Sequence, residues 1–396
     1  MQILYLSGLA SKAAIDDAHR SNPKFSSYAV QKFNRLVTEG FVRNGHSVVA
    51  LSSFYLPGFG CGYYRRKEED NGVQYRYIPS PNIRILRHVW LIVYCFFRVL
   101  FWGLFNKKEK ALVADVLNIS ACIGAIAAAN LIGLSRVGIV TDMPGMRVNR
   151  TKNSIDTNDS RISFNTRMNK GFLGHFTHYV FLTEQMNEVI NVNNSPYIVM
   201  EGLVDVDTKL ECHHKKNDKR IMIYAGGLHE RYGLRLLVEG FIQADVENSE
   251  LWLYGSGPFV EELPVYNHRD SRVIYKGIRP NEEVVAAEME ATLLVNPRPT
   301  HEAFTKYSFP SKNMEFMVSG TPLLTTKLPG MPVEYHKFVY LFETETTDGY
   351  SYAIRKTLTL PLEELHTVGM EAREWVLDNK NNVIQTARII ELINRK

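Results

Sequence analysis

The sequence predicts an α/β protein with two doubly wound, Rossmann-like domains. Short apolar runs alternate with amphipathic segments in both halves of the chain, and the alternation restarts after a polar connector. The length of 396 residues is sufficient for two domains of ordinary size. Alternating strand and helix signals are typical of parallel sheets covered by helices.

The first half opens with a βαβ pattern. Residues 3–6 form an apolar run that ends at Ser7-Gly8, residues 29–41 carry apolar side chains at helical spacing, and residues 47–51 form the next apolar run. The later signals in this half are strands over 111–118, 137–140 and 179–182, and an Ala-rich helix over 122–132. These elements predict the first parallel sheet.

The second half repeats the pattern after a boundary near residues 202–219. Its strand signals cover 220–224, 251–254, 273–275 and 291–295, and a helix is predicted over 233–244. We therefore expect an N-terminal domain over residues 1–203 and a second domain over residues 204–373.

Composition places the chain among folded soluble proteins, with 45% hydrophobic and 22% charged residues. The formal net charge of +4 is small for this length and does not indicate a nucleic-acid partner. The four cysteines lack CxxC spacing, and the N-terminus shows no charged region or cleavage site of a secretory signal. We expect a cytoplasmic location.

The connector contains Cys212-His213-His214, three residues of metal-binding type. Adjacent ligands without a second cluster are poor spacing for zinc, so an ordinary polar linker is the favoured interpretation. No metal site and no cofactor are expected.

The segment of residues 84–110 is unusually aromatic and basic. Its apolar part, residues 89–105, contains seven aromatic side chains, and Arg98 lies near its middle. A run of 17 residues is marginal for a membrane span, so none is predicted. Two alternatives remain open: a helix that contacts the membrane surface, or a domain helix buried against the sheet with Arg98 reaching the solvent.

A short buried helix is predicted from Pro310 to Gly320. Proline suits the first helical turn, glycine suits the C-terminus, and Met314, Met317 and Val318 supply an inward stripe. At about 100° per residue, Ser311, Lys312 and Glu315 share a face beside backbone N–H groups that attract anions. Phosphate and ribose are ligands that such a helix end can hold.

Other loops of the second half point to the same anion site. Gly226-Gly227 is predicted to form a tight turn before a helix, with Arg231 near the helix start. Gly255 lies in a Gly-Ser-Gly loop after the next strand, and Arg298 follows the strand that precedes the Pro310 helix. In open α/β sheets, ligands bind beyond the carboxyl ends of strands, where all these loops lie.

Together these motifs resemble family 4 of the retaining glycosyltransferases, which has the GT-B fold. The motifs are Gly226-Gly227, residues 230–233, residues 254–257, and residues 309–312 with Glu315. The resemblance spans nearly the whole chain and implies two Rossmann-like domains facing a cleft, the second of which binds a nucleotide-sugar. It also implies that helices over about 374–396 cross back to the N-terminal domain.

The resemblance also implies roles for individual residues. Glu315 is similar to the acidic residue that holds the donor ribose in that family. Arg231 is similar to the basic residue that neutralises the charge of the donor diphosphate. Phosphate or the transferred sugar would be held by the segment that contains Ser308, Phe309, Pro310, Ser311 and Lys312. The backbone N–H groups around Phe309, Ser311 and Lys312 would donate the hydrogen bonds. Glu315 paired with Lys312 is the structural alternative.

Two positions depart from the family pattern. Gly227 stands where many relatives have an arginine, and Tyr307 where many have a second glutamate. The missing cation has three candidate replacements in Lys312, Arg298 and Lys306.

Asp142, at the end of the strand over 137–140, is the catalytic candidate in the first domain. A carboxylate there would orient an acceptor hydroxyl or stabilise oxocarbenium charge, whereas a turn or helix cap before Pro144 is the structural alternative. The polar loop over 149–170 is a candidate acceptor lid.

The function favoured by the resemblance is retaining, metal-independent transfer of a sugar from a nucleotide-sugar to a glycan or lipid-linked acceptor, in cell-surface polysaccharide biosynthesis. The location is then cytoplasmic, with peripheral contact at the inner face of the membrane left open. Two alternatives remain: a nucleotide-sugar epimerase of the same fold, and a non-catalytic nucleotide- or glycan-binding subunit.

Overall fold

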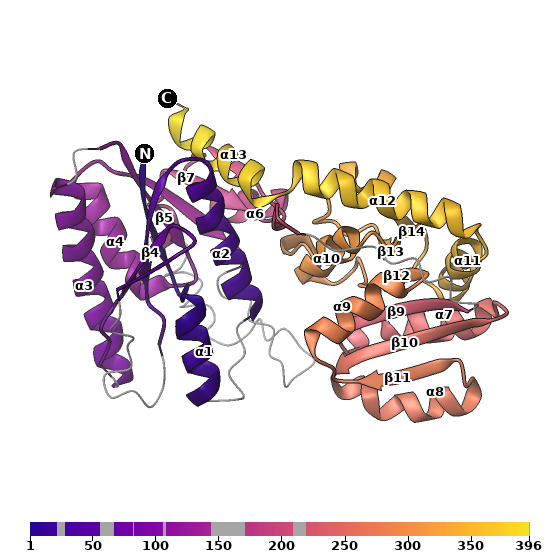
Figure 1. The fold of residues 1–396 in the computed structure, drawn as a ribbon. Helices are drawn as coiled ribbons and strands as arrows, with labels where there is room; N and C mark the ends of the chain where they lie inside the picture. The colour runs from indigo at the N-terminus through magenta and orange to yellow at the C-terminus, as the bar shows by residue number, and fades with distance from the viewer. Residues whose placement is uncertain are drawn as a thin grey trace. The chain divides into compact units, whose positions relative to one another are not determined.

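The chain folds into two compact α/β units, as expected from its alternating pattern (Figure 1). The computed structural model describes residues 1–21, 28–55, 67–81, 83–105, 108–143, 171–208 and 219–395. Unit 1 comprises Met1–Leu203 together with Asn382–Lys396, and unit 2 comprises Val204–Asn381.

Unit 1 is built on an eight-stranded sheet in the order β3-β4-β2-β1-β5-β6-β7-β8. All neighbouring strands are parallel except β3 and β4, which are antiparallel. The strands are β1 (Gln2–Ser7), β2 (Ser47–Ser52), β3 (Glu68–Asp70), β4 (Val73–Tyr77), β5 (Lys110–Asp115), β6 (Ser135–Val140), β7 (His178–Phe181) and β8 (Tyr197–Val199).

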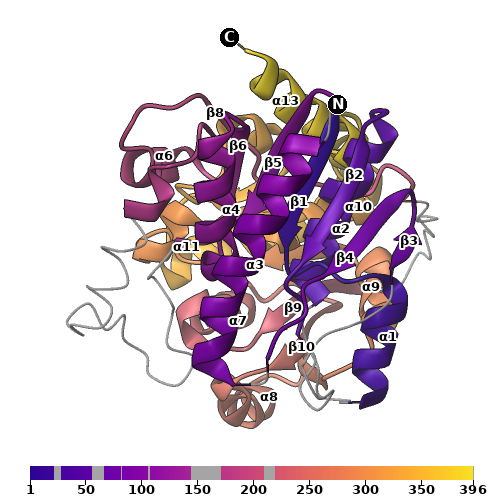
Figure 2. The ribbon, with the colours of Figure 1, turned by 90° about the vertical axis from the view of Figure 1, so that its left-hand side faces the viewer.

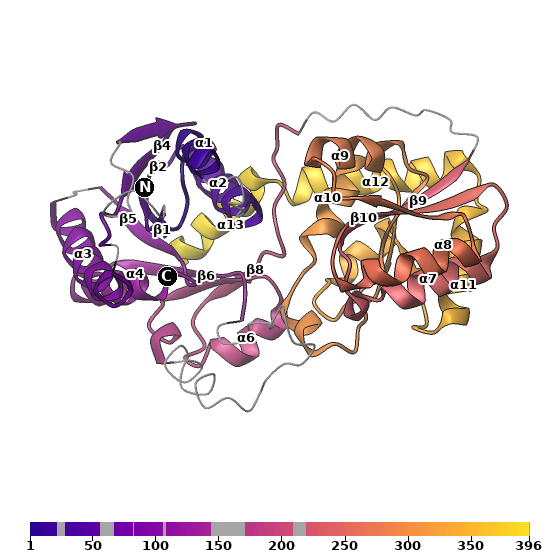
Figure 3. The same cartoon turned by 90° about the horizontal axis from the view of Figure 1, so that it is seen from below.

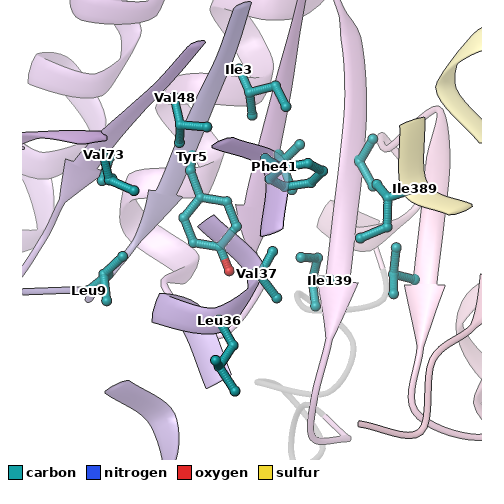
Figure 4. Close-up of a cluster of buried hydrophobic side chains, with 14 of the residues drawn as sticks. Ile3, Tyr5, Leu9, Leu36, Val37, Phe41, Val48, Val73, Ile139 and Ile389 are labelled. Carbon is teal, nitrogen blue, oxygen red and sulfur yellow. The ribbon is translucent and has the colours of Figure 1, made fainter. Parts of the chain in front are cut away.

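Helices cover both faces of this sheet (Figure 3). They are α1 (Lys12–Ser21), α2 (Tyr28–Arg43), α3 (Arg84–Phe105), α4 (Ile119–Leu131), α6 (Glu184–Ile190) and α13 (Asn382–Asn394). The last helix belongs to the core of unit 1, because Ile389 is fully buried together with Tyr5 and Phe41 (Figure 4). Gly40 of α2 permits this packing, since a Cβ atom there would lie 2.3 Å from the Asn382 carbonyl oxygen.

The aromatic segment forms α3, a helix of 22 residues whose inner face packs on α4. Leu91, Cys95 and Val99 are buried, whereas the opposite face exposes large apolar side chains, Phe97 and Phe101 among them. Of the two alternatives, burial within the domain accounts for the inner face of α3 only and leaves the outer face exposed. Within the described residues, α3 is the one helix that is long and apolar enough to cross a membrane, by length and composition alone.

Unit 2 contains a six-stranded parallel sheet in the order β11-β10-β9-β12-β13-β14. The strands are β9 (Arg220–Gly227), β10 (Ser249–Ser256), β11 (Val273–Gly277), β12 (Leu293–Asn296), β13 (Leu323–Thr326) and β14 (Tyr340–Phe342). The chain builds outward from β9 to β11, returns to β12 on the other side of β9, and continues to β14. The topological switch point of this sheet therefore lies between β9 and β12.

Two helical layers enclose the unit 2 sheet (Figure 3). One layer contains α7 (Leu234–Ala244), α8 (Leu263–Arg269) and α11 (Thr347–Leu358), and the other contains α9 (Asn281–Glu290), α10 (Ser311–Ser319) and α12 (Leu362–Asn379). Alternate residues of β9 supply the two cores: Met222 and Tyr224 pack with the first layer, Ile221 and Ile223 with the second. This alternation is the pattern of a strand buried on both faces.

Several local expectations differ from the structure. The strand expected over 111–118 ends at Asp115, because residues 116–118 turn into α4. The closing helices expected from about residue 374 divide differently: α12 packs on α10 and belongs to unit 2, which ends at Asn381, and α13 joins unit 1. Residues 212–214 and 149–170 lie outside the described residues.

Candidate functional site

The loops that follow β9 and β12 in unit 2 meet at the topological switch point. The loop after β9 contains a 3₁₀ turn, Glu230–Tyr232, and then Gly233, with φ of 84°. A Cβ atom on Gly233 would lie 2.0 Å from the carbonyl oxygen of Pro297, which follows β12. Only glycine permits this approach, so the sequence brings the two loops together at the position where open α/β sheets bind ligands.

Arg231 and Arg298 come from these two loops and contact the same aromatic ring. The Cζ atom of each guanidinium lies 5.2 Å from the ring centroid of Tyr232. Arg298 also lies 5.6 Å from the ring of Phe304. Desolvation lowers the pKa of Arg298, and the nearby positive charge of Arg231 lowers it further. The sequence predicted both residues as anion ligands, and the structure brings them to one place.

Three polar atoms of this region are buried without a hydrogen-bond partner in the part of the chain that the structure describes. They are Nε of Arg231, Nε of Arg298 and Oγ of Ser308. Across these described ranges, no carboxylate forms an ion pair with either arginine. Buried donors without partners are uncommon in folded proteins and indicate a site completed by a ligand or water.

Buried hydrogen bonds fix the loop that carries Arg298. The hydroxyl of Tyr350 donates to the Pro297 carbonyl at 2.9 Å, and the hydroxyl of Thr326 donates to the Arg298 carbonyl at 2.5 Å. The side-chain amide of Asn296 donates to Oδ1 of Asn313 at 2.6 Å and thereby joins β12 to α10. The backbone of the site is thus held in place before any ligand binds.

The predicted helix is α10, and its glycine end and buried stripe are confirmed, whereas the proline expected in the first turn lies just before it. Pro310 occupies the N-cap position, Gly320 ends the helix with φ of 79°, and Met314, Met317 and Val318 are buried. Pro310 has no polar side chain and makes no capping hydrogen bond to the helix. The N–H groups at Ser311 and Lys312 therefore form an end of positive potential, on a loop held by the buried ring of Phe309 packed 5.1 Å from Tyr335.

Lys312 and Glu315 of α10 form an ion pair, which is the structural alternative considered for Glu315. Nζ of Lys312 lies 3.3 Å from Oε2 of Glu315 and 3.7 Å from Oε1 of Glu288, a buried residue of α9. Lys312 is thus held between two carboxylates, and it is a weaker candidate than Arg298 for replacing the family's missing cation. Glu315 remains half-exposed, so a ribose hydroxyl can still reach its carboxylate.

The predicted Gly226-Gly227 turn is wrong, because both glycines are the last residues of β9. They pair in register with Gly255 and Ser256 of β10, and the chain turns only after Gly227. A Cβ atom on Gly255 would lie 1.9 Å from the Gly226 carbonyl oxygen, so a side chain there is excluded. Side chains also lie against the other two glycines: a Cβ atom on Gly226 would lie 3.2 Å from the Tyr224 hydroxyl, and one on Gly227 would lie 3.2 Å from the Tyr232 ring.

Asp142 lies in unit 1, directly after β6, where the sequence placed it. Desolvation raises its pKa, although its side chain is exposed, and the exposure argues for a largely solvated carboxylate. The residues that follow it, 144–170, are outside the described part of the chain.

Sequence reasoning missed Asp115, the last residue of β5 at the switch point of unit 1. Burial raises the pKa of this carboxyl to about 6, against hydrogen bonds that lower it. It accepts hydrogen bonds from the Leu117 backbone N–H at 3.1 Å and from the Asn118 amide at 3.3 Å. No local motif marks this residue, and only the strand order reveals its position.

No group of three or more His, Cys, Asp or Glu side chains that would suit a metal ion occurs in the described ranges. The positive charge of the candidate site comes from Arg231, Arg298 and the N-terminus of α10.

Comparisons with known proteins agree with the fold. Residues 219–359 match the family model "Glycosyl transferases group 1". A search of curated proteins gave no significant match. Among solved structures, a sucrose-phosphate synthase from Thermosynechococcus elongatus is 14% identical with a TM-score of 0.66, covering 99% of this chain and 98% of that chain.

Two further structures were solved with ligands. HepE of Anabaena, in complex with UDP, is 13% identical with a TM-score of 0.59 and 99% coverage of both chains. A UDP-forming trehalose-phosphate synthase from Burkholderia xenovorans, in complex with glucose-6-phosphate, is 10% identical with a TM-score of 0.63, covering 99% of this chain and 100% of that chain. The chain thus has the GT-B fold of glycosyltransferases, and its second unit matches the group 1 glycosyltransferase model.

Proposed function

We propose that this protein is a glycosyltransferase whose unit 2 binds the diphosphate of a nucleotide-sugar through Arg231 and Arg298. The observation that carries the proposal is the pair of guanidiniums on Tyr232, with buried Nε atoms that have no partner among the described residues. Guanidinium groups are the side chains best suited to phosphate oxygens. The match of residues 219–359 to the group 1 model supports the same function.

The chemistry of transfer requires stabilisation of a departing nucleoside diphosphate. Negative charge develops on the phosphate oxygens as the bond from the sugar to phosphate breaks, and preorganised cations lower the energy of that state. Arg231, Arg298 and the N–H groups of α10 supply positive charge at fixed positions. We propose that this charge suffices for a metal-independent reaction.

Retention of configuration is part of the proposal. Front-face attack by an acceptor hydroxyl, with the departing phosphate accepting its proton, needs no protein nucleophile. In this scheme Glu315 holds the donor ribose, and Asp142 orients the acceptor or stabilises positive charge on the sugar. The acceptor proposed is a glycan or lipid-linked sugar, in cell-surface polysaccharide biosynthesis on the cytoplasmic side of the membrane.

A donor panel tests the proposal. The full-length protein is incubated with UDP-, GDP- and ADP-sugars, with and without glycan and lipid-linked acceptors, and nucleoside diphosphate release is measured. Acceptor-dependent release that falls at least 100-fold in Arg298→Ala supports transfer. Arg269→Ala is the matched control, because Arg269 is an exposed arginine that pairs with Glu239 on α7.

Two outcomes would overturn the proposal. Isomerisation of the donor sugar without acceptor identifies an epimerase, and nucleotide binding without turnover of any donor identifies a binding subunit. The anomeric configuration of the product, determined by NMR, separately tests retention.

A further inference from the structure

Helix α3 of unit 1 presents apolar side chains on two opposite faces. The inner face is accounted for: Leu91, Cys95 and Val99 are buried. Gly124 of α4 lets the helices approach closely, since a Cβ atom there would lie 1.9 Å from the Ile92 carbonyl oxygen. On the outer face, large apolar side chains such as Phe97 and Phe101 are exposed, and none of the described helices or strands is packed against them. Figure 2 shows α3 facing the viewer, in front of α4.

The exposed face forms one continuous apolar stripe along the helix. The stripe consists of large apolar side chains whose exposed fractions range from 43% to 82%: Ile85, Leu86, Val89, Trp90, Val93, Phe97, Phe101, Leu104 and Phe105. Phe97, Phe101 and Phe105 stack along it, with ring centroids 6.2 Å apart at each step. A helix on the surface of a soluble domain normally turns polar side chains outward, and a contiguous apolar patch of this kind indicates an interaction surface.

The charges beside the stripe show what kind of partner fits it. The helix contains three arginines, Arg84, Arg87 and Arg98, but no aspartate or glutamate. At about 100° per residue, Arg87 and Arg98 lie along one margin of the stripe centred on Phe97. Residues 83–115 contain six Lys and Arg against two carboxylates, a surplus equal to the whole chain's net charge of +4. An apolar stripe bordered by arginines is typical of a helix that lies in the headgroup region of an anionic membrane.

Length and packing favour a helix that lies in the membrane surface over one that crosses the bilayer. Twenty-two residues span about 33 Å, which is enough to cross a bilayer. Crossing would, however, remove the inner face from α4 and break the contact between Nδ1 of His88 and Oγ of Ser120 at 2.8 Å. A helix lying flat buries only the stripe and keeps these contacts.

We propose that the outer face of α3 docks this protein on an anionic lipid bilayer, with the helix lying in the interface. The proposal does not depend on the donor site, because the surface lies wholly on unit 1 and its test needs no nucleotide. Docking of this kind would hold the enzyme where lipid-linked sugars are found.

Vesicle sedimentation of the full-length protein tests the proposal. Vesicles contain either phosphatidylcholine alone or phosphatidylcholine with 30% phosphatidylglycerol. We expect binding to the anionic vesicles that weakens at least tenfold in the double variant Phe97→Glu/Phe101→Glu. Arg98→Gln should weaken it about fivefold on anionic vesicles only, as expected for loss of one surface cation.

The matched control is Val265→Glu/Tyr352→Glu, two exposed positions of unit 2 that receive the same added charge. It should bind as the parent does, and thermal melting checks that every variant is folded. Two results would overturn the proposal: equal vesicle binding by parent and Phe97→Glu/Phe101→Glu, or no vesicle binding by the parent. A dimer in ultracentrifugation that dissociates in Phe97→Glu/Phe101→Glu would assign the stripe to a second copy of this chain instead.

Discussion

Arg231 and Arg298 lie on one aromatic ring, each with its guanidinium carbon 5.2 Å from the centroid of Tyr232. Burial lowers the pKa of Arg298, and repulsion from the like charge of Arg231 lowers it further. Such an arrangement costs stability in the free protein and is relieved by an anion. It therefore has the character of a binding site more than of a structural contact.

Replacement of Arg298 by methionine should separate stability from binding. We expect Arg298→Met to leave the thermal midpoint of the free protein unchanged or to raise it, by up to about 1 kcal/mol in unfolding free energy, because the buried charge is removed. The rise in midpoint on adding a nucleoside diphosphate should be lost. Thermal unfolding with and without UDP, GDP and ADP measures both. A large loss of stability would show that Arg298 has a structural role instead.

Gly233 should be required for the approach of the two loops. Gly233→Ala places a Cβ atom 2.0 Å from the Pro297 carbonyl oxygen, at φ of 84°. We expect a loss of about 2–3 kcal/mol and weaker nucleotide binding, because the loop of Arg298 must move. Gly277→Ala is the control, since Gly277 has φ of 78° but open space around its Cβ position. Equal losses of stability in Gly233→Ala and Gly277→Ala would contradict a role for the close approach to Pro297, because both positions share only the backbone strain.

The buried carboxylate of Glu288 should depend on Lys312. We expect Lys312→Met to destabilise unit 2 by about 1–2 kcal/mol, a value reduced from that of a fully buried pair because the lysine is partly exposed. Adding Glu288→Gln should recover most of this loss, because the buried charge that Lys312 balanced is removed. A double-mutant cycle measured by urea unfolding checks the coupling, and additive effects of the two substitutions would contradict it.

Asp115 predicts a specific dependence of stability on pH. Its pKa of about 6 in the folded protein lies above the unfolded value, so the folded state holds the proton more tightly. Protonation of Asp115 therefore contributes fully to the unfolding free energy below pH 4, and this contribution is lost as the pH rises to about 6. The contribution is about 3 kcal/mol at most. Asp115→Asn should be less stable relative to the parent at pH 4.5 than at pH 7. Thermal midpoints at both values measure this, and a pH-independent difference would contradict it.

The sequence correctly predicted the elements whose start, end and buried face are determined by residues close by in the sequence. The helix α10 is the clearest case, because Pro310, Gly320 and the methionine stripe specify its start, end and buried face. The Gly226-Gly227 turn was wrong for the opposite reason. Strand β9 continues because β10 pairs with it as far as Ser256, and that partner is distant in sequence.

The site shows the same division. Arg231 and Arg298 were predicted because each follows a strand, whereas their shared contact with Tyr232 depends on the strand order of the sheet. The pairing of Lys312 with Glu288 joins two helices and has no signature in either segment. Asp115 was missed because its burial arises from elements distant in sequence. For α3, the apolar pattern alone did not show which face packs on α4.

The most direct test of the central claim is calorimetric titration of the full-length protein with a nucleoside diphosphate, the matching monophosphate and the nucleoside. For at least one base among UDP, GDP and ADP, we predict binding at least tenfold tighter for the diphosphate than for the monophosphate. This preference should be lost in Arg231→Ala/Arg298→Ala and retained in Arg269→Ala. Equal affinity of the parent and the double variant for the diphosphate, or no binding of any nucleotide, would contradict the assignment of these two arginines to a donor site.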